Sequence, residues 1–127
     1  MKKQDLPLSP HLQIYKPQIT SLLSISHRIS GVALNFVLVI LVLGLLCITL
    51  GESYFELLIS LINSFPIKII IFLAILGFSY HFLNGIRHII WDFGFLLGNR
   101  SSAIFGYIII ATSFISSIFI SMLLGLF

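Results

Sequence analysis

Three long runs without a charged residue constrain this chain more than any other feature of its sequence. The runs have 22, 18 and 27 residues and cover residues 29–50, 69–86 and 101–127. A helix needs about 20 mostly apolar residues to cross a bilayer, and tilt or interfacial ends accommodate the deviations. The runs therefore predict an all-α integral membrane protein with three transmembrane helices. We place the N-terminal segment and the three spans at residues 1–28, 29–50, 66–88 and 102–126.

The overall composition excludes a soluble domain. Hydrophobic residues make up 58% of the chain and charged residues 9%, with a mean hydropathy of +1.14, whereas soluble domains carry about 25% charged residues. The basic residues form no patch with interleaved aromatics, so we expect no nucleic-acid partner. Cys47 is the only cysteine and lies within an apolar run, which indicates a small packed side chain. Residues 1–28 do not resemble a signal peptide, and we expect them in the mature protein.

Charges beside the runs predict the orientation of the chain. Four basic residues precede the first span: Lys2, Lys3, Lys16 and Arg28. The first connector, about residues 51–65, contains Glu52 and Glu56 but no lysine or arginine. Arg87 and Arg100 flank the second connector. Because basic loops stay on the inner side, we expect the N-terminus inside and the C-terminus outside. This topology brings the start of the first span and the end of the second to the same, inner side.

The stretch SISHRISG, residues 24–31, places polar side chains just before the first apolar run. Ser24 and Arg28 are four residues apart and share a helix face, with His27 adjacent to it. Gly31 continues that face one turn deeper and leaves room for a bulky group. One interpretation is an interfacial helix start, in which Ser24 caps the helix and Arg28 reaches the headgroups. The other is a binding site in which the guanidinium is paired.

The second span carries a polar stripe with spacings of four, three and four residues: His81, Gly85, His88 and Asp92. His81 lies seven residues, or about 10 Å, deeper than His88. An imidazole without a partner is costly in lipid, so His81 is a functional candidate. Gly85 removes a side chain that would block a flat ligand, and a neutral imidazole beside bare backbone suits axial ligation of haem iron. A hydrogen bond between helices is the alternative.

The two histidines of the stripe cannot both bind one iron, because ligands from one helix face cannot reach opposite sides of a porphyrin. If His81 is a ligand, we expect the second ligand to come from another chain. His88 and Asp92, with Arg87 close by, could equally form an interfacial cluster of ion pairs and hydrogen bonds.

In the third span, small residues predict a face for helix packing: Ser113, Ser116, Ser117, Ser121 and Gly125.

Two segments together resemble the cytochrome b subunit of succinate dehydrogenase, the larger membrane anchor of respiratory complex II. The first signature of that family is a proline-led segment followed by S-x-x-H-R-x-[ST], here PLSPHLQIYKPQITSLLSISHRIS. The second signature is H-x-x-x-G-[apolar]-R-H-[apolar]-x-[aromatic or Met]-D-x-G, here HFLNGIRHIIWDFG. The resemblance covers about residues 6–94. This chain departs from the family at Leu6, where an arginine usually precedes the leading proline.

The resemblance implies a role for each matching residue. His81 would be an axial ligand of a non-covalent b-type haem, with the other histidine supplied by a second, smaller anchor subunit. Ser24 and Arg28 would line the ubiquinone site, and His27 and Arg28 would lie near the haem propionates. His88 and Asp92 match positions to which we assign a structural role or a supporting role around the ligands.

The resemblance also implies partners and a location. We expect three partner subunits in addition to the lipid bilayer: a peripheral flavoprotein, a peripheral iron–sulfur protein and the second small anchor. The second anchor would complete a haem-binding helical bundle with this chain. The chain would not be catalytic alone. We expect an inner membrane, bacterial first and mitochondrial second. The alternatives are a fumarate reductase anchor, which runs the reverse reaction, and a membrane scaffold without redox activity.

Overall fold

The computed structural model describes residues 16–127, and this range contains four helices and no strand. The helices are α1 (Ile19–Thr49), α2 (Glu52–Asn63), α3 (Phe65–Asp92) and α4 (Asn99–Leu123). Three of them, α1, α3 and α4, are long and apolar enough to cross a membrane. The predicted all-α fold with three spans is therefore confirmed. Residues 1–15, with Lys2, Lys3 and Leu6, lie outside the described residues.

Helix α1 extends beyond the first charge-free run. It begins at Ile19, so the stretch 24–31 is helical and continuous with the apolar residues that follow. Its 31 residues span about 46 Å, against a hydrocarbon core of about 30 Å. One end of α1 therefore reaches past the hydrocarbon. The positions of the bilayer boundaries along the helix stay a prediction.

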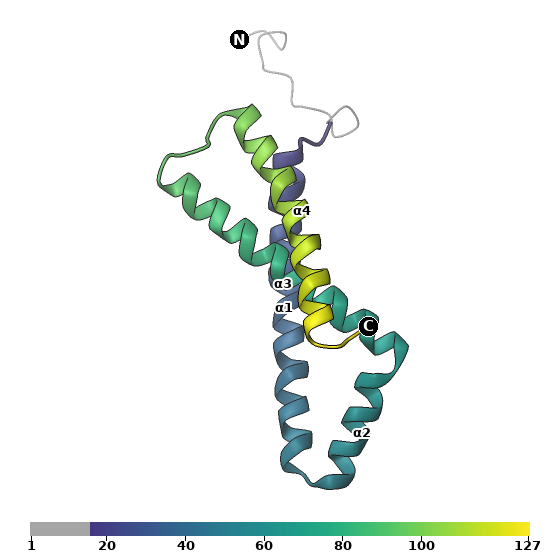
Figure 1. Cartoon of the computed structure of the whole chain (residues 1–127). Coiled ribbons are helices and arrows are strands. Elements are labelled where there is room, and N and C mark those ends of the chain that lie inside the picture. Colours follow the sequence, from purple (N-terminus) through teal and green to yellow (C-terminus); the bar gives the residue numbers. More distant parts are fainter. Residues whose placement is uncertain (1–15) are drawn as a thin grey trace, which may run out of the picture.

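The first connector folds into α2, a helix that the sequence pattern did not predict. Gly51 turns the chain after α1 with a φ of 118°, a conformation that side chains with a Cβ rarely adopt. Ser64 is extended, and Pro66 stands in the first turn of α3. Proline suits this position because the first turn of a helix leaves its N–H groups unpaired in any case. Figure 1 shows that α2 folds back beside the far end of α1.

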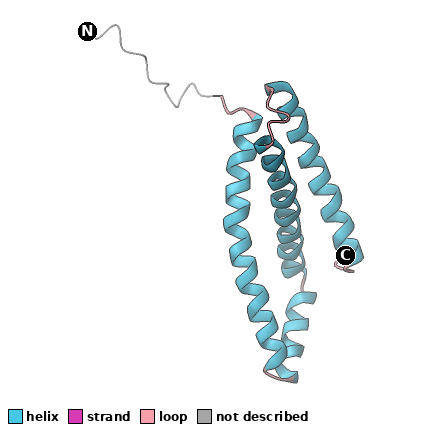
Figure 2. Cartoon of the chain, turned by 90° about the vertical axis from the view of Figure 1, so that its left-hand side faces the viewer, coloured by secondary structure: helices cyan, strands magenta, loops and turns pink. Residues whose placement is uncertain are grey.

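Helix α3 is the centre of the fold and packs against both α1 and α4. Its C-terminal end is set by Gly94, which has a φ of 81°. The Gly94 N–H donates to Trp91 O and the Phe95 N–H donates to Ile90 O, the two bonds that close a helix around a left-handed glycine. Figures 1 and 2 show the start of α1 and the α3–α4 connection at the same end of the molecule.

The interface between α3 and α4 is built from small side chains. Ser113, Ser117 and Ser121 are buried at intervals of four residues, which confirms this part of the predicted packing face. The hydroxyls of Ser113 and Ser117 donate to Ile109 O and Ser113 O of their own helix. These serines therefore present little polar surface and let the two helices approach closely. Gly125 does not belong to this face; it is exposed and ends α4 with a φ of 63°.

Candidate functional site

Three imidazoles from two helices form a stack between α1 and α3. The ring of His27 lies on that of His81, with centroids 4.0 Å apart and planes 9° from parallel. The ring of His27 also lies near that of His88, with centroids 5.2 Å apart and planes tilted by 44°. We call these three rings the histidine stack. His27 thus inserts from α1 between two histidines that sit seven residues apart on α3.

Both glycines of the signatures lie beside rings of the histidine stack. A Cβ on Gly85 would lie 3.8 Å from Cε1 of His27, an ordinary van der Waals distance. The His27 imidazole therefore lies next to the bare patch that the sequence predicts for a flat ligand. Gly31 lies against His81, and a Cβ there would stand only 2.9 Å from Cε1 of that ring. The bulky group that Gly31 accommodates is the His81 side chain.

The hydrogen bonds around His81 determine which ring nitrogen is free. Its Nδ1 lies 3.1 Å from Ser30 Oγ and 3.2 Å from His27 O. The Ser30 hydroxyl donates its own proton to His27 O at 2.8 Å. Both oxygens can therefore accept from Nδ1, which carries the proton in a neutral ring. The lone pair of Nε2 remains available, and this is the arrangement in which a histidine binds a metal.

A groove of about 380 Å³ runs beside His81. Phe78 lies on its α3 side, and Leu34, Asn35 and Leu38 lie on its α1 side. The Asn35 amide donates to Gly31 O within its own helix at 2.9 Å, so it leaves the groove wall mainly apolar. The groove is open, and this chain supplies only part of its wall. A flat apolar ligand with a metal centre would fit beside Nε2 if another chain closed the site.

His27 adds an unsatisfied polar atom to the same region. Its Nδ1 is buried and has no hydrogen-bond partner among the described residues. Buried polar groups are nearly always paired. An acceptor or donor from a bound group or from a partner chain would satisfy this nitrogen. The residues present therefore fit a haem in two respects, a free imidazole lone pair at His81 and an unpaired nitrogen at His27.

Ser24 and Arg28 lie outside the histidine stack. Ser24 is half-buried and Arg28 is exposed. On a helix with 100° per residue, both point to the side of α1 away from Leu23, the residue that packs toward α4. Arg28 borders a shallow apolar groove with Val32 and Phe36. Residues 16–127 do not by themselves enclose a site around the Ser24–Arg28 pair.

Of the two other candidates on α3, the structure brings only His88 to the histidine stack. His88 is half-buried, and its ring meets Trp91 edge-on at 5.2 Å and 89°. Asp92 is exposed in the last turn of α3. The Arg87 side chain turns toward α4, where it bonds to Ser102, and among residues 16–127 no ion pair joins it to Asp92.

Arg87 is the residue whose role the sequence reasoning missed. It is fully buried, and its NH2 group donates to Ser102 O and Ser102 Oγ at 3.1 and 3.0 Å. Its NH1 donates to Asn84 Oδ1 at 3.3 Å, and its Cζ lies 4.1 Å from the centre of the Trp91 ring. The spacing of residues 84, 87 and 91 places all three on one helix face, which is the signal that could have revealed this contact.

Tyr80 links α3 to α1, as Arg87 links α3 to α4. Its hydroxyl donates to Leu23 O at 2.7 Å. A Cβ on Gly106 of α4 would overlap Cδ1 of Leu23. Leu23, four residues after the start of α1 at Ile19, is therefore held by α3 and α4 together. These contacts fix the height of α1 against α3 and thereby the position of His27 in the histidine stack.

Comparison with known proteins gives this site a family. The model of the succinate dehydrogenase/fumarate reductase transmembrane subunit matches residues 2–120. The succinate dehydrogenase cytochrome b556 subunit of Rickettsia typhi is 43% identical over 118 residues, which are 93% of this chain and 89% of the relative. The cytochrome b560 subunit of Marchantia polymorpha is 45% identical over 101 residues, 75% of this chain and 73% of the relative. That of Chondrus crispus is 44% identical over 104 residues, 76% and 78%. The chain therefore belongs to the family of succinate dehydrogenase and fumarate reductase transmembrane subunits.

Proposed function

We propose that this chain is the cytochrome b anchor of a succinate:ubiquinone oxidoreductase and that His81 is an axial ligand of its b-type haem. The observation that carries this proposal is the geometry of His81. Its Nδ1 is held by Ser30 and the His27 carbonyl, and its Nε2 is left free beside an apolar groove. The names of the relatives, all cytochrome b subunits, support the same assignment.

The other wall of the haem site belongs, in this proposal, to a second small anchor subunit. The groove beside His81 is open, and the other two histidines of the described residues, His27 and His88, pack in the stack and do not line it. The second anchor would therefore supply the second axial ligand. His27, through its unpaired Nδ1, and Arg28 would bind the propionates. When bound, the haem would accept and return single electrons.

Ser24 and Arg28 would form this chain's part of the ubiquinone site. A hydroxyl and a guanidinium on one helix face can donate to the two kinds of quinone oxygen, carbonyl and developing alkoxide. The Ser24 hydroxyl would orient one carbonyl, and the Arg28 guanidinium would stabilise the negative charge that develops on an oxygen during reduction. Arg28 is exposed in this chain, so partner subunits would exclude water from the site.

The electrons would come from succinate through a flavoprotein subunit and an iron–sulfur subunit docked on the inner side. The charge distribution supports an N-in, C-out orientation. In this orientation, the start of α1 and the α3–α4 connection would lie next to the iron–sulfur subunit. The inner membrane would be bacterial or mitochondrial, with the bacterial one proposed first. A fumarate reductase anchor is the second candidate, because the family includes both enzymes.

Two pairs of variants in the assembled complex test the proposal. His81→Ala should abolish the haem difference spectrum, whereas His88→Ala should retain it, because only His81 borders the groove. Arg28→Ala should leave succinate oxidation by soluble dyes intact and abolish ubiquinone reduction, whereas the exposed Arg100→Ala should change neither. A normal haem spectrum in His81→Ala contradicts the ligand assignment. Equal loss of dye and quinone reduction in Arg28→Ala contradicts the quinone-site role.

The reaction direction has its own measurement. Rates with ubiquinone and with a lower-potential menaquinone, compared on the same preparation, separate a succinate dehydrogenase from a fumarate reductase. A purified complex without haem and without quinone reduction supports the scaffold alternative instead.

A further inference from the structure

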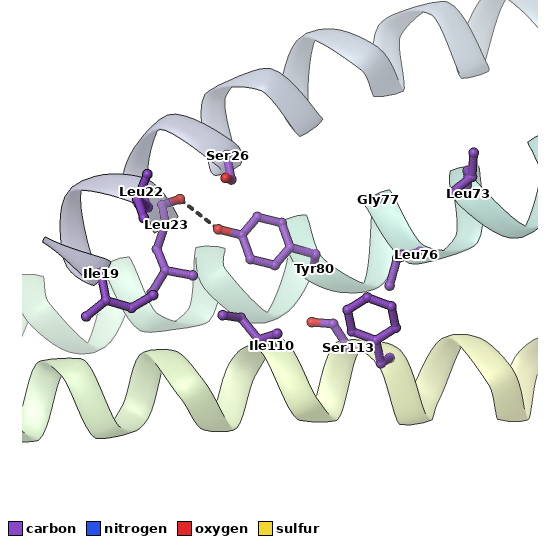
Figure 3. Close-up of a pocket in the computed structure, with 11 residues that line it drawn as sticks. Ile19, Leu22, Leu23, Ser26, Leu73, Leu76, Gly77, Tyr80, Ile110 and Ser113 are labelled. Carbon is purple, nitrogen blue, oxygen red and sulfur yellow. Dashed lines mark hydrogen bonds between the residues drawn. The ribbon is translucent and has the colours of Figure 1, made fainter. Parts of the chain in front are cut away.

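A second, separate cavity lies between α1, α3 and α4. Its volume is about 530 Å³, within the range of about 300–1,000 Å³ that is typical of ligand sites. Four residues of α1, four of α3 and three of α4 line it, and Figure 3 shows their arrangement. Ile19 stands at one end and Leu73 at the other. Leu73 and Tyr80 on α3 are seven residues, or about 10 Å, apart, so the cavity is elongated along the helices.

The hydroxyl groups of this cavity are already paired with protein atoms. The Tyr80 hydroxyl donates to Leu23 O at 2.7 Å (Figure 3), and the Ser26 side chain hydrogen-bonds to Tyr80. The Ser113 hydroxyl donates to Ile109 O at 2.7 Å. A buried water needs two to four polar partners, and a quinone or other polar headgroup needs free donors. The cavity therefore suits an occupant that makes no hydrogen bonds.

The rim of the cavity is apolar and open to the surroundings of this chain. Leu22, Leu73 and Phe114 line the cavity, and each has about half of its side chain exposed. Because α3 and α4 are apolar enough to cross a membrane, we expect the exposed Leu73 and Phe114 to contact lipid hydrocarbon. The cavity is also centred on a different side of α3 from the His81 groove, because Leu73, Leu76 and Tyr80 lie about 80–160° around the helix from His81 and Phe78. A second anchor that completes the haem site would leave it uncovered; this step rests on the proposed function.

We propose that the cavity is a binding site for one acyl chain of a membrane phospholipid. The chain enters between Leu22 and Phe114 and lies along α3, with Gly77 as the floor. A Cβ at Gly77 meets no atom within 4 Å, so this glycine keeps the cavity open. The bound chain replaces the side chains that would otherwise fill the gap between diverging α1 and α4, and so contributes dispersion contacts to the bundle.

Two glycines allow a matched test. Gly77→Leu fills the cavity, and Gly44→Leu places the same side chain on α1, at a position where a Cβ also meets nothing within 4 Å but which does not line this cavity. The assembled complex is purified from membranes, and its bound lipids are identified by native mass spectrometry. We expect a phospholipid in the wild-type and Gly44→Leu complexes that is lost from Gly77→Leu. Haem content and ubiquinone reduction should be equal in all three, so failure of this site is distinguishable from failure of the proposed function.

A photochemical experiment on the unaltered chain covers the case in which Gly77→Leu does not assemble. The complex is placed in vesicles of phosphatidylcholine with a diazirine in the middle of one acyl chain. The labelled lipid is then exchanged against unlabelled lipid for increasing times before irradiation. We expect adducts on the peptides with Leu76 to Tyr80 and Ile110 to Phe114 to form even after the exchange that abolishes adducts at the exposed Phe119. Loss of both sets of adducts at the same rate overturns the proposal. Recovery of a quinone in place of a phospholipid also overturns it.

Discussion

Replacing Gly31 by alanine should disturb the haem without unfolding the protein. The added methyl carbon would stand 2.9 Å from Cε1 of His81, where ordinary van der Waals contacts begin near 3.4 Å. The ring must therefore move by about 0.5 Å. It cannot move freely, because His27 stacks on it and Ser30 and the His27 carbonyl hold its Nδ1.

The expected change in stability is small because two effects oppose each other. Overpacking a filled interior costs about 1–3 kcal/mol, while alanine is favoured over glycine in a helix by about 1 kcal/mol. The net destabilisation is thus about 0–2 kcal/mol. The side chains that bind a metal or cofactor, in contrast, tolerate a displacement of only about 0.5 Å. We expect the altered ligand geometry to be visible before any loss of fold.

The assay is the reduced-minus-oxidised difference spectrum of the assembled complex, with the haem-to-protein ratio and the electron paramagnetic resonance of the oxidised haem. Gly85→Ala is the matched control, since its methyl would lie at an ordinary 3.8 Å from Cε1 of His27. Gly31→Ala should shift the signals or lower haem occupancy, and Gly85→Ala should leave them unchanged. If both variants give wild-type signals at full occupancy, the inferred packing of His81 against Gly31 is wrong.

Three further variants test contacts around the site. Ser30→Ala should weaken haem retention about tenfold, because groups that hold a metal-binding histidine typically contribute this much. Ser30→Thr should restore haem retention. The haem that remains bound after dialysis is the measurement. Arg87→Lys should lower stability by about 1–3 kcal/mol, because lysine cannot make the two bonds to Ser102 and lie flat on the indole; unchanged thermal melting refutes this. Gly106→Ala should destabilise by about 1–3 kcal/mol through its clash with Leu23; Leu23→Ala should relieve part of that loss in a double-mutant cycle.

The spans and the site candidates follow from local sequence properties. The absence of charge over three runs predicts three membrane helices because a charge in hydrocarbon is costly whatever the tertiary structure. The helical repeat places His81, Gly85 and His88 on one face, and this face does meet α1 in the structure. The left-handed position of Gly94 likewise explains why a glycine closes the second signature.

The partners of these residues depend on contacts between distant segments. Arg87 and His88 are neighbours in sequence, yet one is fully buried against α4 and the other turns to α1. A periodic pattern shows which residues share a face but does not show which helix covers it. Gly85 illustrates this, since the sequence does not show that His27, 58 positions earlier in the chain, lies beside it.

The sequence by itself determined that the chain is a three-span membrane protein, because a charged side chain is costly in lipid. It also determined which histidine is the candidate ligand, because the helical repeat shows which residues share a face and how deep each lies. Only the tertiary structure decided how that histidine is held. The Ser30 hydroxyl and the His27 carbonyl reach Nδ1 of His81 from another helix, and Leu23, Tyr80 and Gly106 set the height at which the helices meet. The free nitrogen of His81 is therefore a consequence of packing between helices that the chain brings together only when it folds.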